Sequence, residues 1–473
     1  MHSLKSILAA QLLAGLFVLL PVVSPAQNLP QQSPERDAAE QKNMELVGHS
    51  DLSGNGDGGE GMAIQQWPDG RRILYIAHEG EKTCLSVVDV SHPEKPVMVN
   101  QLPSPQPGVT RCNSLGLSGN VLVVANQAKK VGQTSAGLWV LDVSDFSRLQ
   151  TARKLQDLSF SFFDTSGPAS PGVHYVWFVD GQFAHLTTGT KDSRPTNQKD
   201  NQFYIIVDLR DPRKPREAAR WWLPGTQQGD VCLPNCLPER HKIDDGYRSH
   251  TIEVLPERPD RAYVGYIDGG QLILDISGLN EVRAGGTTNF TPKLVSRLKF
   301  SPPYPAWTHT VQPIFDRDLA FVSDESVQDA CADAPKLVWL VDIRAETNPV
   351  IIGTAPFAPN AAELCKRGGR YGSHNLSPNF PRPTSAKLKN STVATFFNGG
   401  VRIFRLVDVS GVAKAPPRIE EVGYFIPPAP RNNPTHAIAI NHAIVDEHGL
   451  IYAVDRETGG LYILKYTGQP PLD

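Results

Sequence analysis

One short pattern recurs along the chain and constrains the fold more than any other feature of the sequence. Two or three apolar residues are followed by an Asp, and Ser or Pro often comes just after it. Six copies are centred on Asp89, Asp142, Asp208, Asp275, Asp342 and Asp408, and a degenerate seventh is Tyr462–Lys465. Successive copies are 53, 66, 67, 67, 66 and 57 residues apart, and so regular an interval indicates a repeat architecture.

Each repeat reads as four short strands, and the fourth repeat shows this most clearly. Its apolar runs lie at 251–255, 262–266, 271–276 and 293–300, with turn-forming residues between them. The 40 Pro and 39 Gly of the chain also favour many short strands over long helices. We therefore predict an all-β fold, a seven-bladed β-propeller of four-stranded antiparallel blades over residues 44–470. The repeated Asp is expected to bond turn amides, which is a structural role.

The two ends of the chain predict how the ring closes. The last repeat ends near Tyr466 without a fourth strand, while Asn43–Gly48 precedes the first repeat and resembles the fourth strand Glu421–Tyr424. The N-terminal segment is therefore expected to supply the outer strand of the last blade. This pairing would leave no sheet edge open at the junction.

The first 43 residues differ in character from the repeats. An apolar run, Ile7–Val23, follows Lys5 and precedes small residues, so residues 1–26 are predicted to be a signal peptide cleaved after Ala26. The alternative is an uncleaved anchor, since 17 residues approach the length of a membrane span. Residues 27–43 are polar and aperiodic and read as a linker. The mature protein is expected in the periplasm or outside the cell, where disulfides form.

Six cysteines allow 15 disulfide connectivities, and the repeat narrows the choice. In two pairs, one cysteine follows the second strand of a repeat and the other precedes the first strand of the next repeat. The remaining two enclose a three-residue loop. The expected disulfides are Cys84–Cys112, Cys331–Cys365 and Cys232–Cys236.

The apolar-Asp strands are often followed by Pro-x-x-Pro, as in Pro93–Pro96 and Pro212–Pro215. These strands resemble the repeats of the LVIVD-repeat proteins of bacteria. Gly369–Asn375, Asn398–Phe404 and Gly449–Arg456 resemble further motifs of that family, and the resemblance covers about residues 44–468. It implies an exported propeller. It implies no particular activity, because function does not follow from the fold.

Histidines recur in register with the repeats, at the start of each first strand. They are His174, His250, His309 and His374, with either His436 or His442 in the last repeat, where the spacing to Asp455 favours His442. First strands line the central channel of a propeller, so these imidazoles are expected to converge on one mouth of it. Neutral imidazole is the commonest metal ligand, and three of them with an open position would hold a catalytic Zn or Cu ion.

Second strands end at the same mouth, and several end in groups suited to acid–base catalysis. The candidates are His78, Glu79, Asp324 and Asp455. A purely structural role for the histidines is an open alternative. A Ser/Thr-His-Thr sequence at a strand start can also fasten a loop to the backbone of the neighbouring blade.

Two classes of function stay open, and the sequence does not decide whether the protein is an enzyme. The first is an exported enzyme that uses one Cu or Zn ion on a small molecule or saccharide at the channel mouth. The second is a non-enzymatic binding or scaffold propeller for a protein or glycan. With 46 Lys and Arg against 49 Asp and Glu, the chain has no excess of positive charge that would favour binding to nucleic acid. We expect a monomer with no membrane span after signal cleavage.

Overall fold

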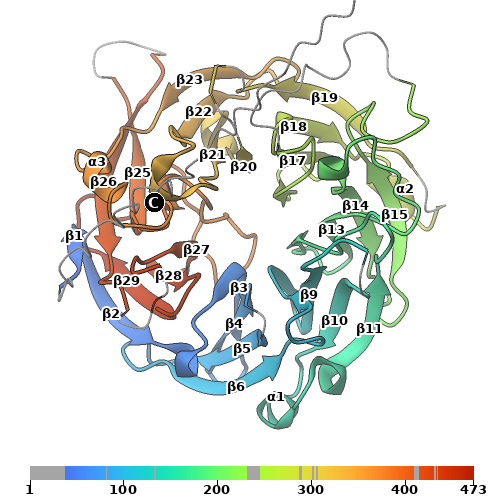
Figure 1. Ribbon diagram of the computed structural model, residues 1–473, viewed down its shortest axis with the longest axis horizontal. Coiled ribbons are helices and arrows are strands. Elements are labelled where there is room, and N and C mark those ends of the chain that lie inside the picture. The colour runs from blue at the N-terminus through green and yellow to red at the C-terminus, as the bar shows by residue number, and fades with distance from the viewer. Residues whose placement is uncertain are drawn as a thin grey trace, which may run out of the picture. The chain divides into compact units, whose positions relative to one another are not determined.

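The structure is a computed structural model of the chain. It describes residues 38–80, 82–132, 135–231, 245–286, 290–300, 303–304, 307–409, 415–430, 433 and 435–473. In these ranges the strands form seven antiparallel sheets, which stand as blades around a common axis (Figure 1). This confirms the predicted seven-bladed propeller. The expected signal peptide, residues 1–26, and the expected Cys232–Cys236 bond lie outside the described residues.

The first three blades follow the chain in order, each from the axis outward. Blade one contains β3 (Gly58–Gln66), β4 (Arg72–His78), β5 (Thr83–Asp89) and β6 (Val97–Pro103). Blade two contains β7 (Thr110–Arg111) and β8 (Leu115–Ser118), both paired with β9 (Val121–Ala128), then β10 (Gly137–Asp142) and β11 (Ser159–Asp164). Blade three contains β12 (Tyr175–Trp177), β13 (Phe183–Thr188), β14 (Phe203–Asp208) and β15 (Arg216–Trp221).

The next two blades repeat this order. Blade four contains β16 (Ile252–Glu253), β17 (Arg261–Tyr266), β18 (Gly270–Asp275) and β19 (Lys293–Leu298). Blade five contains β20 (Thr308–Ile314), β21 (Leu319–Asp324), β22 (Val338–Asp342) and β23 (Val350–Thr354). Short α-helices lie between strands at α1 (Phe146–Thr151), α2 (Leu279–Arg283) and α3 (Ala361–Leu364). Single 3-10 turns lie at Leu52–Gly54, Leu155–Leu158, Gln198–Asp200, Phe315–Arg317 and Asp329–Cys331.

The last two blades take in the N-terminal segment. Blade six contains β24 (Ser391–Thr395), β25 (Val401–Val407), β26 (Arg418–Ile426) and, at the outer edge, β1 (Glu40–Lys42). Its innermost layer is formed by residues 374–377, which hydrogen-bond to β24. Blade seven contains β27 (Ile440–Val445), β28 (Leu450–Asp455), β29 (Leu461–Tyr466) and β2 (Met44–Ser50).

The ring closes as the sequence predicts. Strand β2 pairs antiparallel with β29, with Met44 opposite Tyr466 and Ser50 opposite Leu461. Residues 40–42 form β1 on the edge of blade six, although the sequence placed them in the linker. The N-terminal segment thus joins two adjacent blades, and Asn43, with a φ of 51°, forms the bend between them.

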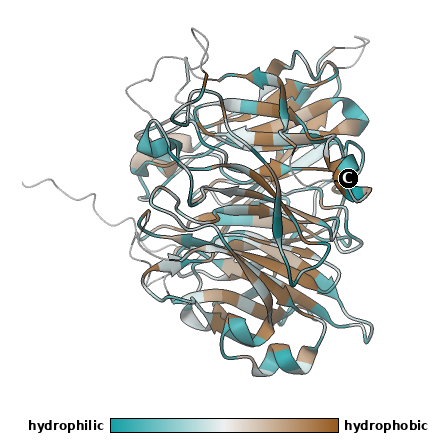
Figure 2. Cartoon of the chain, turned by 90° about the vertical axis from the view of Figure 1, so that its right-hand side faces the viewer, coloured by the Kyte–Doolittle hydropathy of each residue, from teal (hydrophilic) through white to brown (hydrophobic). Residues whose placement is uncertain are grey.

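The repeated Asp ends the third strand of blades one to five and fixes the turn that follows. Its carboxylate accepts a hydrogen bond of 2.9–3.1 Å from the amide two residues later at Asp89, Asp142, Asp208, Asp275 and Asp342. The core lies between adjacent blades, and the strands that form it carry mostly hydrophobic residues (Figure 2). Leu138 of blade two and Leu186 of blade three, for example, belong to one buried cluster. No helix among the described residues is long and apolar enough to cross a bilayer.

Residues 378–389 of blade six form a crossing segment, which lies over the end of the ring where the innermost strands finish. Phe380 stacks on Trp177 at the end of β12, with ring centroids 5.1 Å apart. Thr384 donates to the carbonyl oxygen of Ile64 in β3 at 3.0 Å, and the amide of residue 386 donates to residue 445 in β27. Because these contacts reach blades one, three and seven, the segment covers that end of the axis.

Candidate metal centre

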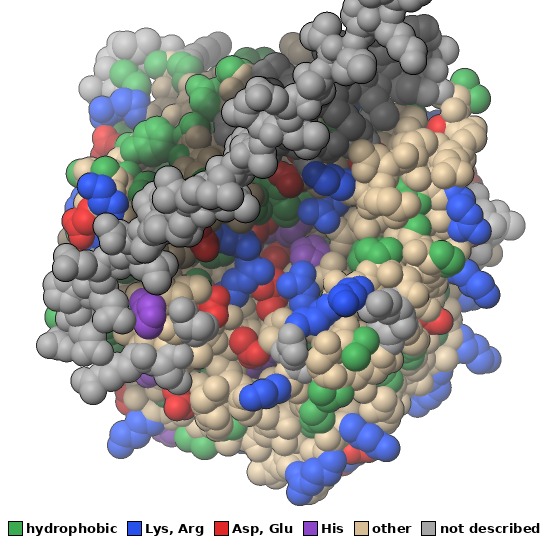
Figure 3. Space-filling view, viewed as in Figure 1, with side chains coloured by type: hydrophobic (Ala, Val, Ile, Leu, Met, Phe, Trp, Pro, Cys, Tyr) green, Lys and Arg blue, Asp and Glu red, His purple; other side chains and the backbone are tan. Residues whose placement is uncertain are grey.

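Five histidines meet at the opposite end of the ring, where the innermost strands begin; we call this end the mouth. Their ring centroids form a chain, 4.5 Å from His174 to His250, 4.0 Å from His250 to His309 and 4.3 Å from His309 to His374. The fifth is His442 in β27, and all five are buried. His436 is exposed, with a φ of 54°, so His442 takes the place in the last blade. Seen along the axis, His, Lys/Arg and Asp/Glu side chains gather in the central hollow (Figure 3).

Glu60 of β3 reaches these histidines from blade one. Its carboxylate oxygens lie 3.9 Å from Nε2 of His174, 3.4 Å from Nε2 of His309 and 3.8 Å from Nε2 of His374. Only 4% of the residue is exposed. The sequence analysis did not identify Glu60, because blade one has no histidine in the repeat register to draw attention to this strand.

The backbone around Glu60 explains its position. Strand β3 bulges between Gly58 and Met62, and the amide of Glu60 donates to the carbonyl oxygen of Asn113 in blade two at 2.6 Å. A Cβ atom on Gly59 would lie 2.4 Å from that same carbonyl oxygen. Blade one therefore approaches blade two closely only because a glycine stands here, and this approach directs the Glu60 side chain into the cluster.

A second carboxylate, Glu325, follows β21 in blade five. Its oxygens lie 3.9 Å from Nε2 of His309 and 3.7 Å from Nε2 of His374. Arg370 donates to Oε1 of Glu325 at 3.1 Å and holds the side chain in place. Burial raises the pKa of Glu325, while the charges of His309 and Arg370 oppose this effect.

These groups form two sets suited to a metal ion, Glu60 with His250 and His309, and Glu325 with His309 and His374. In each set one donor atom per residue lies within 4.8 Å of the others. Ligand atoms at about 2.0–2.1 Å from a tetrahedral Zn²⁺ lie about 3.4 Å apart. The distance of 3.4 Å between Glu60 and His309 already matches that spacing.

The hydrogen bonds of the imidazoles show which nitrogens are left for a ligand. Nδ1 of His374 donates to the carbonyl oxygen of Asn441 at 2.8 Å, which leaves the lone pair on Nε2. Nδ1 of His174 donates to Gln127 at 2.9 Å, so its Nε2 accepts from Nε2 of His250, also at 2.9 Å. The remaining nitrogens, Nδ1 of His250 and Nε2 of His309 and His374, are buried and make no hydrogen bond.

The charge state of the cluster also suits a cation. Burial lowers the pKa of His174 to about 3 and of His442 to about 4, and places the pKa of His250 and His374 well below the usual value. These imidazoles are therefore neutral at pH 7. Burial raises the pKa of Glu60, whereas positive charge on the adjacent imidazoles, His250 first, would place it well below its usual range. Because burial keeps His250 and His174 neutral at pH 7, an ionised Glu60 has no counter-charge from them.

Two of the predicted acid–base residues are hydrogen-bonded within their own blades. Oδ2 of Asp324 accepts from the indole of Trp339 at 2.9 Å. Asp455 accepts from the amides of Ala439 at 2.7 Å and Gly459 at 2.6 Å. Burial raises the pKa of each carboxyl to about 6. Neither residue belongs to the two ligand sets.

The other two predicted residues also lie outside those sets. His78 bonds Asp57 through Nδ1 at 2.6 Å and Ser86 through Nε2 at 2.7 Å, so both of its nitrogens are engaged. Glu79 stands at the mouth and pairs with Arg456 at 2.6 Å. The structure thus groups the predicted histidines but not the predicted bases.

Two disulfides lie at the mouth. The pairings Cys84–Cys112 and Cys331–Cys365 are both present and confirm two of the expected bonds. Cys112 directly precedes Asn113, whose carbonyl oxygen holds Glu60, so the first bond steadies one side of the cluster. Disulfides indicate an oxidising compartment.

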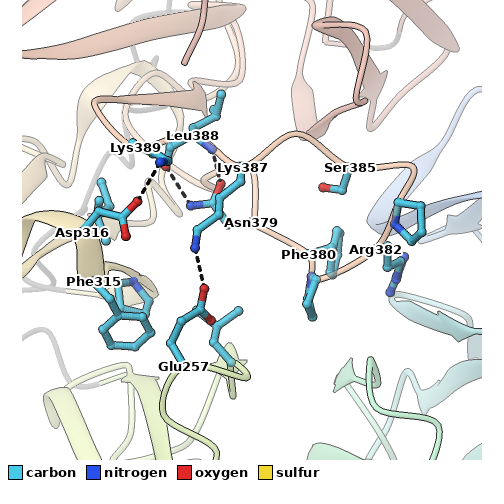
Figure 4. A pocket seen from close by; sticks show the side chains of 15 residues that line it. Glu257, Phe315, Asp316, Asn379, Phe380, Arg382, Ser385, Lys387, Leu388 and Lys389 are labelled. Atoms are coloured by element: carbon cyan, nitrogen blue, oxygen red, sulfur yellow. Dashed lines mark hydrogen bonds and ion pairs between the residues drawn. The ribbon is translucent and has the colours of Figure 1, made fainter.

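A separate cavity of about 280 Å³ lies beside the crossing segment, on the far side of the ring (Figure 4). Leu255, Phe315 and Phe380 line it together with a salt bridge of 2.5 Å between Lys387 and Glu257. None of the clustered histidines lines this cavity.

No protein-family model matches the chain, and no curated protein matches it in sequence. Among solved structures it is similar to Chaetomium thermophilum Raptor (TM-score 0.50, 10% identity, 91% of this chain and 30% of that one) and to the C-terminal WD40 domain of Sif2 (0.49, 10%, 90% and 99%). A third is a protein of Bacteroides uniformis provisionally assigned as a 6-phosphogluconolactonase (0.44, 11%, 77% and 87%). Such likenesses concern the fold alone. The protein is a seven-bladed β-propeller with a buried histidine–glutamate cluster.

Proposed function

We propose that the histidine–glutamate cluster binds one Zn or Cu ion and is the active site of an exported enzyme that acts on a small molecule or saccharide. The observation that carries this proposal is the set of buried, unbonded atoms, Nε2 of His309 and His374 and Oε2 of Glu60. A buried polar atom without a hydrogen bond costs about 1–3 kcal/mol. Several such atoms facing one another are best explained by a ligand that they share.

The donor set fits a transition metal by its chemistry. Imidazole nitrogen and carboxylate oxygen suit Zn²⁺ and Cu²⁺, and Nδ1 bonds such as that of His374 fix the ligand orientation. When bound by three protein ligands, such an ion polarises a substrate oxygen or lowers the pKa of a bound water. His309 belongs to both ligand sets, and whichever of Glu60 and Glu325 stays outside the coordination sphere is placed to accept a proton.

The cellular context is part of the same proposal. The apolar run at residues 7–23, the disulfides and the resemblance to LVIVD-repeat proteins together support an exported propeller with its signal peptide removed, and we propose that it acts as a monomer. A buried cluster of functional side chains favours a small substrate over a protein partner.

The test is elemental analysis of the exported protein, residues 27–473, purified without chelator. We expect about one Zn or Cu per chain, lost in His309→Ala because this residue serves both ligand sets. His448→Ala is the control, since His448 is exposed and distant in the fold from β20. Wild-type protein that takes up neither metal after incubation with both would contradict the proposal and favour a binding propeller for a protein or glycan.

A further inference from the structure

Next to the histidine cluster, three side chains carry hydrogen-bond donors that no acceptor satisfies among the described residues. They are Nε of Arg248, Nε2 of Gln202 and Nε1 of Trp307. Gln202 is 2% exposed and Trp307 8% exposed, so water satisfies neither of them freely. Arg248 is partly exposed and borders the mouth. Three unsatisfied donors gathered around one guanidinium favour a ligand that accepts hydrogen bonds.

Contacts join these three residues to each other and to the cluster. Nη1 of Arg248 donates to Oε1 of Gln202 at 3.3 Å, which aligns the amide beside the guanidinium. The guanidinium carbon lies 5.3 Å from the centroid of the Trp307 ring. That ring in turn lies 5.6 Å from the imidazole of His250, edge to face. The three donors therefore lie together, and the Trp307 ring is in contact with the candidate metal ligand His250.

Arg248 also differs from the other arginines at the mouth in its charge balance. Arg370 is paired with Glu325 at 3.1 Å and Arg456 with Glu79 at 2.6 Å. Within the described part of the chain Arg248 forms no salt bridge, and its guanidinium contacts the Gln202 amide and the Trp307 ring instead. A half-buried guanidinium without a paired anion is a preferred site for one.

We propose that Arg248, Gln202 and Trp307 bind an oxyanionic group of the substrate, a carboxylate or a phosphate, and hold it beside the metal centre. The free Nε edge of a guanidinium donates two parallel hydrogen bonds to such a group, and the amide and indole donate further ones. The substrate class is thus a small anionic molecule. The placement of the anion beside a metal centre rests on the proposed function, whereas the binding of the anion does not.

The test measures anion binding and metal content on the same samples. Wild-type protein, with and without added zinc, is titrated with succinate and with inorganic phosphate by calorimetry. We expect saturable binding of at least one anion, weakened about tenfold or more in Arg248→Met, the loss typical of a hydrogen bond to a charged group. Gln202→Glu, which sets a carboxylate against Arg248, should weaken binding as much.

Two further variants make the result decisive. Arg213→Met is the matched control, because Arg213 is an exposed arginine 5.0 Å from the ring of Phe160 and has no unsatisfied neighbour. Arg248→Lys keeps the charge but loses the Nε edge, and it should bind less tightly than wild type. If Arg248→Met does not fold, as circular dichroism would show, Gln202→Glu and Arg248→Lys decide the question.

Each outcome separates this inference from the proposed function. Equal affinity in all variants, or no saturable binding of either anion, would overturn the anion site even if the protein contains metal. Binding that depends on Arg248 in a protein that takes up no metal would overturn the metal centre alone. A clear preference for succinate or phosphate identifies the oxyanion.

Discussion

Removing the Cys84–Cys112 bond tests how firmly blades one and two are held at the mouth. The bond closes a loop of 28 residues, and loop-closure entropy for this length corresponds to about 3.6 kcal/mol at 25 °C. Unfolding entropy of about 2.1 cal/mol/K per residue gives roughly 0.9 kcal/mol/K for a propeller of this size. The double variant Cys84→Ala/Cys112→Ala should therefore melt about 4 °C below wild type.

Denaturant titration and calorimetry measure this loss, and a second pair provides an internal comparison. Cys331–Cys365 closes a loop of 34 residues, so its removal should cost about 3.8 kcal/mol. Only the first bond adjoins Asn113, which holds Glu60, so only its removal should also weaken zinc binding. If the Cys84→Ala/Cys112→Ala variant unfolds within about 1 kcal/mol of wild type, the entropic reasoning fails.

Three further results are expected. Zinc at 100 times its Kd should raise the free energy of unfolding by about 2.7 kcal/mol, and hence Tm by about 3 °C, reversibly with chelator; an unchanged Tm speaks against the metal centre. Burial raises the pKa of Asp455 from 3.8 to about 6, so the folded state favours its protonated form. The stability from this group is full below about pH 4 and is lost as the pH rises through about 6. Asp455→Asn should remove up to about 3 kcal/mol of that pH dependence in urea titrations, and an unchanged pH profile would disprove the assignment. His78→Ala leaves the Asp57 carboxylate without its imidazole partner, while Ser86 keeps the hydrogen bond from Gln101. The change should cost about 2 kcal/mol of stability while the metal content stays at the wild-type level; loss of metal would assign His78 to the site.

The fold was predictable because its repeat is fixed by local chemistry. A carboxylate that bonds the amide two residues later, as Asp89 does with Ser91 at 2.9 Å, depends on short sequence context alone. The pattern therefore survives in six of the seven repeats and reveals the blade period. The closing strand was predictable for a different reason: the last repeat lacks a fourth strand, so β29 would otherwise have an open edge.

The site was only partly predictable, because some of its residues follow the repeat and others depend on contacts between blades. The histidines occupy one place in the repeat, so register alone brings His250, His309 and His374 together. Glu60 depends on a bulge in β3 and on the close approach of Gly59 to another blade, which no local pattern encodes. Asp455 shares the register of the mouth, yet its carboxylate is taken up by backbone amides.

The crossing segment has a consequence for how any ligand travels. Because Phe380 and Thr384 fasten this segment to blades three and one, it lies across part of the far end of the described ring and obstructs approach from that side. A ligand of the histidine cluster is therefore expected to enter and leave by the mouth. Threading of a long polymer along the axis would require this segment to move aside.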